Sequence, residues 1–407
     1  MGFDEVINRK NTNSVKWDMN EEFFGRKDIL SMWVADMDFK APDEVLGALK
    51  KRVEHGIFGY SYRSDSYLES IISWVKKRHG WNIKKEWITF SPGIVPALGV
   101  TVEAFSNIGD KILVQSPSYP PFKQTIKDNG RIVIDNKLII KDNKYYMDLD
   151  KLHKQITIKD VSFTSNSGSG KLLKDAKVKM FMLCNPHNPV GRVWTKEELI
   201  KLGDVCLENN MIIVSDEIHS DIIYSDYKHI PIASLSKELE QNSITCIAPS
   251  KTFSLAGLST SVIIIPNEKL RNEFNDILSK HRLDGGNVLG EVALEAAYTH
   301  GENWLEDLLF YLEGNLNYLK DYLKVNIPQI KPIDSEATYL VWLNCSGLKL
   351  KDRDLLDFFV EKAGIGVNPG SAFDEECLEY VRLNIACPRA ILKTALDNLK
   401  KAVDEII

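Results

Sequence analysis

The sequence predicts an α/β protein in which a mostly parallel, doubly wound sheet forms a large domain and the two ends of the chain form a smaller α+β domain. Between about residues 65 and 285, helix-like segments alternate with short apolar runs rich in Val, Ile and Phe. This pattern is typical of strands buried on both faces of a parallel sheet. After residue 285 the pattern changes to long amphipathic helices and two strand-like stretches. A chain of 407 residues also exceeds what one hydrophobic core usually supports.

The chain is therefore expected to divide into three segments. Residues 1–50 form an N-terminal segment that joins the small domain, residues 51–285 form the large domain, and residues 286–407 form the C-terminal small domain. Within the large domain six apolar runs are expected to be strands. They are residues 87–90 (WITF), 111–115 (KILVQ), 178–184 (VKMFMLC), 211–215 (MIIVS), 243–248 (SITCIA) and 261–266 (SVIIIP).

The connecting and C-terminal segments have their own patterns. Residues 195–210 are expected to be helical, because apolar residues recur at helical spacing after the capping pair Thr195 and Glu198. Residues 292–323 predict long helices, and TYLVWLN (338–344) and YVRLNIA (380–386) predict strands. The polar stretch 164–177 is expected to be a flexible surface loop. It is not a P-loop, because Ser165 stands where the first glycine of that motif is required.

The charge and apolar patterns argue against two classes of partner. The 51 basic and 57 acidic residues give a formal charge of −6 and form no basic stripe, so nucleic acid is not an expected partner. No stretch reaches the roughly eighteen apolar residues that a membrane span requires, and the N-terminus lacks the apolar core of a signal peptide. We therefore expect neither secretion nor membrane insertion.

The cysteines indicate a reducing, cytoplasmic setting. They lie far apart, show no C-x-x-C spacing and mostly fall in apolar runs, so they are expected to be reduced core residues. They are Cys184, Cys206, Cys246, Cys345, Cys377 and Cys387.

Chemically useful side chains follow several of the predicted strands. Ligands of open parallel sheets bind beyond the carboxyl ends of the strands. After WITF, a turn containing Gly93 enters a helix near Pro96, whose first N–H groups at Ile94 and Val95 are suited to a phosphate. Tyr119 follows KILVQ within the rigid turn SPSYPPF.

The next three runs are followed by an amide, a group of acids with an imidazole, and an amine. NPHNPVG contains Asn188 in a tight turn for which a cis Asn-Pro bond is one option. MIIVS leads into Asp216 and then His219, and SITCIA leads into Ser250 and Lys251. Each is weak evidence alone, because an Asp after a strand often caps a helix and a lysine is usually a solvated surface charge.

Together these residues predict a site for pyridoxal-5'-phosphate (PLP). This cofactor needs a lysine for its aldehyde and a carboxylate that keeps its ring nitrogen protonated. It also needs donors for its phenolate and its phosphate.

Four motifs in the same order carry a resemblance to a known family. They are NPHNPVGR (185–192), SDEIHSD (215–221), SKTFSLAGL (250–258) and RLNIACPR (382–389). In these motifs the chain resembles the fold-type I PLP enzymes of the aminotransferase class I/II superfamily, collinearly from about residue 30 to 390. The combination of four spaced motifs is highly specific.

The resemblance implies roles for individual residues. Lys251 would form the Schiff base with PLP, Asp216 would pair with the ring nitrogen, and Asn188 would donate to the ring oxygen. Tyr119 would stack on the ring or flank the substrate, and Arg382 would bind the substrate α-carboxylate in a bidentate fork. Ile94, Val95 and Ser250 would hold the phosphate. The alternative for Arg382 is a structural ion pair in the small domain.

Two departures from the common aminotransferase pattern narrow the resemblance. His219 replaces the usual tyrosine three residues after the aspartate, and Ser259 replaces the usual arginine eight residues after the lysine. In these two positions, and in the segments MWVADMDF (32–39) and FGYSYR (58–63), the chain resembles the cystathionine β-lyase branch of the MalY/PatB type. That branch cleaves the carbon–sulfur bond of cystathionine or cysteine S-conjugates to a thiol, pyruvate and ammonia. It is homodimeric, which implies that Tyr60 reaches the neighbouring cofactor phosphate. Trp33 and Tyr119 are candidates for holding the substrate.

Three other functions remain open at this stage. A true aminotransferase would use the same fold and the same site, because these do not determine the outcome of the reaction. A metal enzyme would use Asp216, Glu217, His219 and Asp221, but alternate residues of a strand face opposite ways and no second histidine cluster is evident. A regulator without turnover would not need Lys251, and no DNA-binding module is attached. No metal is expected.

Overall fold

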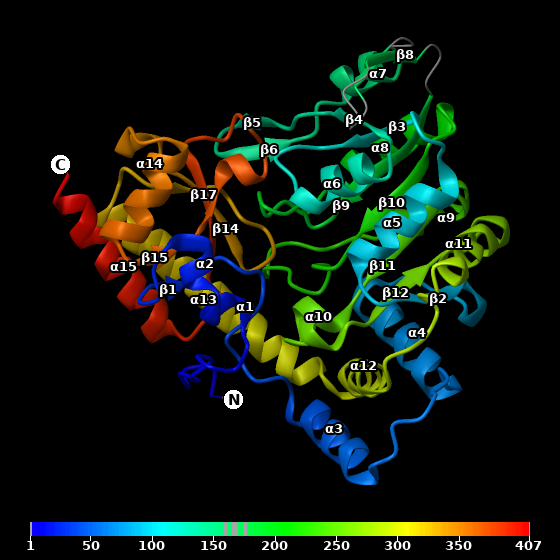
Figure 1. The fold of residues 1–407 in the computed structure, drawn as a ribbon, viewed down its shortest axis with the longest axis horizontal. Helices are drawn as coiled ribbons and strands as arrows, with labels where there is room; N and C mark the ends of the chain where they lie inside the picture. Colours follow the sequence, from blue (N-terminus) through cyan, green and yellow to red (C-terminus); the bar gives the residue numbers. More distant parts are fainter. Residues whose placement is uncertain (1, 158–160, 165–169, 174–176, 407) are drawn as a thin grey trace.

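The computed structural model describes residues 2–157, 161–164, 170–173 and 177–406. Its main feature is a seven-stranded sheet in which only β12 runs antiparallel to its neighbours (Figure 1). The strands in spatial order are β2 (Ile88–Ser91), β12 (Ser261–Ile264), β11 (Ser243–Ile247), β10 (Ile212–Asp216), β9 (Val178–Cys184), β3 (Lys111–Val114) and β4 (Ile132–Asp135). The prediction of a mostly parallel sheet is confirmed, and all six expected runs are strands of it.

The sequence pattern did not identify β4. This strand lies at the edge of the sheet, and all four of its residues are only half-buried. Its residues 132–134 (IVI) form an apolar run like those of the central strands, but the edge position leaves them only half-buried.

Helices pack on both faces of this sheet because its strands are apolar on both sides. Along β9, Met180 and Met182 belong to one buried cluster, whereas Phe181 and Leu183 belong to another. The first cluster includes side chains of α5 (Ile94–Phe105), α6 (Pro120–Asp128) and α11 (Glu268–Lys280), and the second includes those of α8 (Lys196–Glu208). The predicted capping box of α8 is present: Thr195 Oγ1 accepts from Glu198 N, and the Glu198 carboxylate accepts from Thr195 N.

A second, antiparallel sheet forms in the C-terminal part of the chain. Its strands in spatial order are β13 (Lys331–Pro332), β14 (Leu340–Asn344), β17 (Tyr380–Asn384) and β16 (Asn368–Pro369). α13 (Glu302–Asn326) and α15 (Arg389–Asp404) pack with it in one apolar cluster. Both expected strands, in residues 338–344 and 380–386, are found here.

The N-terminal segment contacts this smaller part of the molecule. β1 (Leu30–Ser31) pairs in parallel with β15 (Ile365–Gly366), and the blue N-terminal segment lies beside the orange C-terminal elements in Figure 1. α12 (Val288–His300) packs against α3 (Asp43–His55) and α4 (Asp65–His79). The domain boundaries near residues 50 and 285 remain predictions.

The segment 164–177 was expected to be a flexible loop, and that expectation is wrong for part of it. β8 (Gly170–Leu173) pairs with β7 (Val161–Thr164) in an antiparallel hairpin. Such pairing satisfies the backbone polar groups of a polar stretch that has no apolar period. Residues 165–169 and 174–176 lie outside the described residues.

The remaining elements are short or peripheral. They are α1 (Val15–Asp18), α2 (Asn20–Phe24), β5 (Ile139–Lys141), β6 (Lys144–Tyr146), α7 (Leu149–Thr157), α9 (Lys237–Gln241), α10 (Pro249–Thr252) and α14 (Asp352–Asp357). All six cysteines are buried and unpaired, as expected. Among the described residues, no helix has the length and apolar character needed to cross a bilayer.

Candidate active site

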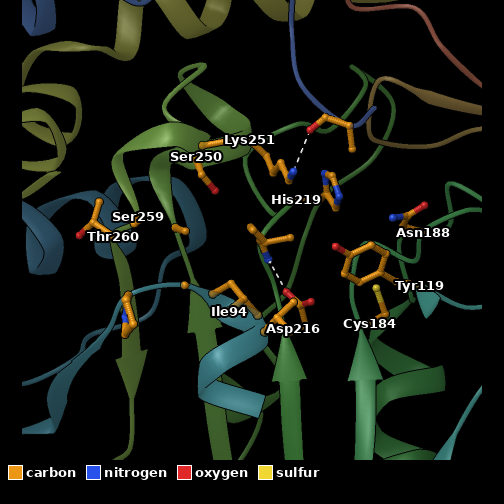
Figure 2. A pocket seen from close by; sticks show the side chains of 17 residues that line it. Ile94, Tyr119, Cys184, Asn188, Asp216, His219, Ser250, Lys251, Ser259 and Thr260 are labelled. Atoms are coloured by element: carbon orange, nitrogen blue, oxygen red, sulfur yellow. Dashed lines mark hydrogen bonds between the residues drawn. The ribbon is translucent and has the colours of Figure 1, made fainter. Parts of the chain in front are cut away.

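A pocket opens at the edge of the large sheet where the parallel strands end (Figure 2). Its lining comes from turns that follow four different strands, from the start of α5, from the residues before β12 and from Ala35, so residues far apart in the sequence meet there. Eight of the predicted site residues line it. They are Ile94, Val95, Tyr119, Asn188, Asp216, His219, Ser250 and Lys251.

Lys251 supplies a buried amine to this pocket. It lies on α10, directly after β11, and its Nζ donates a hydrogen bond to the Ala35 carbonyl at 2.7 Å. Burial and the nearby Arg382 guanidinium lower the pKa of Lys251 to about 8. An amine with this pKa is partly neutral near neutral pH, as a nucleophile or general base must be.

Asp216 ends β10 and supplies a buried carboxyl group below Lys251 in Figure 2. Its Oδ1 accepts a hydrogen bond from Ile218 N at 3.1 Å. Burial raises the pKa of Asp216 to about 7. A cation beside this group, such as a protonated ring nitrogen, would favour its ionised form.

The first turn of α5 and three hydroxyl groups form one wall of the pocket. Gly93 is the N-cap residue of α5, so the free N–H groups of this helix start at the pocket. Figure 2 shows Ser250, Ser259 and Thr260 on the side of the pocket opposite Tyr119 and Asn188. Thr260 Oγ1 is buried. Hydroxyl donors at a helix N-terminus fit a phosphate group.

Thr260 was not a predicted site residue, and Ser259 was noted only as a departure from the family pattern. Both precede β12, whereas the predicted pocket residues follow strands. Because β12 is antiparallel, its amino end lies at the edge where its neighbours have their carboxyl ends. The direction of one strand therefore decided which residues reach the pocket.

Tyr119, Asn188 and His219 form the opposite side of the pocket. His219 is 3% exposed, and its Nδ1 has no hydrogen-bond partner. Burial, followed by the cations Lys251 and Arg382, lowers the pKa of His219 to about 3, so its ring is neutral. Cys184, the last residue of β9, also lines the pocket, although the sequence predicted only a core residue there. The Asn185–Pro186 and Asn188–Pro189 bonds of this turn are both cis.

Arg382 lies next to this side of the pocket, on β17 of the small sheet. Its Nη1 donates to Asn188 Oδ1 at 3.0 Å, and its Nη2 donates to the Trp33 carbonyl at 3.0 Å and to Asn368 Oδ1 at 2.8 Å. Burial lowers the pKa of Arg382 to about 10, so it stays cationic near neutral pH. Its buried Nε has no partner. No carboxylate is among its hydrogen-bond partners, which leaves its charge available to an anionic ligand.

Tyr60 and Trp33 do not line the pocket of their own chain. The Tyr60 side chain is fully exposed. The Trp33 indole Nε1 donates to the Lys16 carbonyl at 3.1 Å, and its ring packs on Phe23. Trp33 approaches the site through its backbone carbonyl, which binds Arg382. The direct contact of its ring with substrate remains a prediction.

The four side chains of the metal alternative do not converge on one point. Asp216 faces the pocket, whereas Glu217 accepts a hydrogen bond from the His229 ring at 2.8 Å. Asp221 accepts hydrogen bonds from Trp74 and Thr252. In the described part of the chain, no group of three His, Cys, Asp or Glu side chains is placed to hold a metal ion.

Comparison with known proteins agrees with this donor set. Residues 27–399 match the family described as aminotransferase class I and II. The cystathionine beta-lyase PatB of Bacillus subtilis (strain 168) is 42% identical over 403 residues, which cover 99% of this chain and 100% of that protein. A PLP-bound putative aminotransferase from Clostridium difficile 630 is 44% identical with a TM-score of 0.93, covering 99% of both chains. A PLP-bound C-S lyase from Staphylococcus hominis is 35% identical with a TM-score of 0.88, covering 100% and 99% of the two chains.

Proposed function

Since the chain belongs to the aminotransferase class I and II family, we propose that it is a PLP-dependent carbon–sulfur β-lyase. It cleaves cystathionine or another cysteine S-conjugate to a thiol, pyruvate and ammonia. The observation that carries this function is the pocket itself, in which Lys251, Asp216 and the N-terminus of α5 converge within a chain that is similar from end to end to a cystathionine β-lyase.

Different pocket residues would bind different parts of PLP. Lys251 would bind the aldehyde carbon, Asp216 the ring nitrogen, and Asn188 the ring oxygen. The phosphate would be held by the N-terminus of α5 together with Ser250 and Thr260. When bound, PLP withdraws electrons from the substrate α-carbon, which makes its proton acidic and allows a thiolate to leave from the β-carbon.

The protein holds the substrate and moves its proton. Arg382 and Asn188 bind the α-carboxylate, which turns the substrate so that its α-hydrogen faces Lys251. The Lys251 amine takes that proton, as its lowered pKa allows. His219 remains neutral and lines the same pocket. In this proposal Lys251 is therefore the residue that carries the α-proton.

The decisive experiment follows product formation from L-cystathionine in the absence of a keto acid. We expect equal amounts of free thiol, pyruvate and ammonia, with no increase on adding 2-oxoglutarate, because a thiolate is a good leaving group next to the activated α-carbon. Strict dependence on 2-oxoglutarate without thiol release would identify an aminotransferase, the activity named for the Clostridium difficile structure.

We further propose that the enzyme is a homodimer with shared active sites. The connection between α3 and α4 exposes a group of large apolar side chains, namely Ile57, Phe58, Tyr60 and Tyr62. Single exposed apolar residues are common, but a contiguous group is typical of an interaction surface. Val95, at the rim of the pocket, is also exposed. A second copy covering this surface would bring Tyr60 to the partner's phosphate site.

The dimer has a direct physical test. Light scattering should give twice the chain mass of 46.2 kDa, and Tyr60→Ala should keep that mass while retaining PLP less tightly during dialysis. A wild-type particle of one chain mass would contradict the shared site. Tyr227→Ala, which changes another partly exposed tyrosine, serves as the matched control and should retain PLP like the wild type.

A further inference from the structure

Five consecutive backbone carbonyls, those of residues 33–37, accept hydrogen bonds from side chains. Trp33 O accepts from Arg382, and Val34 O accepts from Asn384. Ala35 O accepts from Lys251 and Tyr339, and Asp36 O accepts from Asn384 and Lys16. Met37 O accepts from Arg9, and all these donor–acceptor distances are 2.6–3.3 Å. Two of these donors, Lys251 and Arg382, are the proposed base and the proposed carboxylate-binding residue.

This segment has no regular secondary structure, so its carbonyls need side-chain donors. The donors come from separate parts of the chain. Lys251 belongs to α10 beside the large sheet, whereas Arg382 and Asn384 belong to β17 of the small sheet. The position of the segment is therefore coupled to the positions of both functional cations.

A group of four charged residues, two of which also donate to these carbonyls, holds the end of the segment. Arg9 pairs with Asp36 at 2.8 Å and with Asp38 at 2.7 Å, and Lys16 pairs with Asp38 at 2.8 Å. Lys16 is 1% exposed and Asp38 is 5% exposed. Burial acts to raise the pKa of Asp38, but Lys16 and hydrogen bonds from its neighbours hold that pKa below its usual value. A charged group this deeply buried is held only by well-formed pairs.

We propose that Arg9, Lys16, Asp36 and Asp38 form an anchor that positions the carbonyls of residues 33–37, and through them Lys251 and Arg382, for catalysis. These four are positioning residues, since none of them lines the pocket. The inference rests on the proposed function and assigns a task to the motif MWVADMDF that the cofactor site does not explain. Small displacements of a reacting or binding group are costly, because effective catalysis depends on its alignment.

The test uses the holoenzyme and begins with Arg9→Ala. Of the two cations of the anchor, Arg9 is more exposed than Lys16, with 23% of its side chain accessible. Three quantities are measured. The dissociation constant of L-alanine, which has no leaving group on its β-carbon, comes from the change in the cofactor absorption, and kcat and KM are measured with L-cystathionine. We expect alanine binding to weaken about tenfold and kcat/KM to fall about ten- to a hundredfold.

Three further variants define the comparison. Arg9→Lys should recover part of the loss, because it keeps the charge without the fork that binds two carboxylates. Arg382→Lys, which changes the carboxylate-binding side chain itself, should weaken alanine binding at least as much as Arg9→Ala. Arg26→Ala is the matched control, because Arg26 also pairs with an aspartate of the N-terminal segment, Asp28, but donates to none of the five carbonyls. It should stay within about twofold of wild type.

The inference fails if folded Arg9→Ala binds alanine and turns over cystathionine like the wild type, even if its Tm is lower. Should Arg9→Ala not fold, Trp17→Phe replaces it, since the Trp17 indole donates to Asp38 at 2.9 Å and phenylalanine removes that bond while keeping an aromatic ring. Wild-type alanine binding in Trp17→Phe would then overturn the anchor. If the wild-type enzyme catalyses transamination rather than elimination, the proposed lyase function is wrong. The comparison of alanine binding between the variants still tests the anchor in that case.

Discussion

Lys251→Ala is expected to abolish thiol release from L-cystathionine, with a loss of at least about 10³-fold in kcat, and to remove the visible absorption of the bound cofactor. Two tasks disappear together. The amine that binds the PLP aldehyde is gone, and so is the base whose lowered pKa of about 8 suits proton removal. Product assays and an absorption spectrum of the purified variant measure the two losses separately.

The control for this prediction is Lys269→Ala. Lys269 is an exposed lysine of α11 that does not line the pocket. It should keep both the spectrum and the activity of wild type. A Lys251→Ala protein that stays coloured and releases thiol at the wild-type rate would show that another amine holds the cofactor.

Asp216→Asn is expected to lower kcat by about 10²- to 10³-fold while leaving the fold intact. An amide cannot stabilise a protonated ring nitrogen as a carboxylate does, so the charge that develops on the substrate loses its electrostatic support. Steady-state kinetics at saturating PLP measure the effect. Activity within a fewfold of wild type would show that Asp216 is not the partner of the ring nitrogen.

The same substitution should stabilise the cofactor-free protein, by an amount that increases with pH. Burial raises the pKa of Asp216 from 3.8 to about 7, so folding favours its protonated form. The cost of holding the ionised carboxylate in the fold is absent well below pH 4, grows as the pH rises, and is complete above about pH 7, where it reaches up to about 4 kcal/mol. Asp216→Asn avoids it.

The corresponding measurement is the Tm of both apoproteins at pH 5 and pH 8. The variant should gain more over wild type at pH 8 than at pH 5. A gain that is equal at the two values would mean that the carboxylate is not penalised by burial. Together with the loss of kcat, the expected result would identify Asp216 as a residue kept for function at the expense of apoprotein stability.

Local patterns were sufficient to predict the central strands and most of the pocket. A buried parallel strand is a continuous apolar run, and its end brings the next polar residue to the ligand edge of the sheet, which is why Asp216, Asn188 and Lys251 were recognisable in the sequence. The same patterns did not reveal β4, although its residues 132–134 are apolar, or the hairpin of β7 and β8, which has no apolar run longer than two residues.

What the sequence determined by itself was therefore the order of elements, the sheet type and the chemical set of the pocket, since each depends on residues that are neighbours along the chain. Only the tertiary structure decided that Thr260 reaches the pocket, through the reversed direction of β12. It also decided that the Trp33 carbonyl rather than its indole approaches Arg382. Contacts between distant segments determine the direction of strand pairing, the orientation of side chains and the pairing of Arg9 with Asp36 and Asp38. The periodicity of neighbouring residues does not encode the free energy of those contacts.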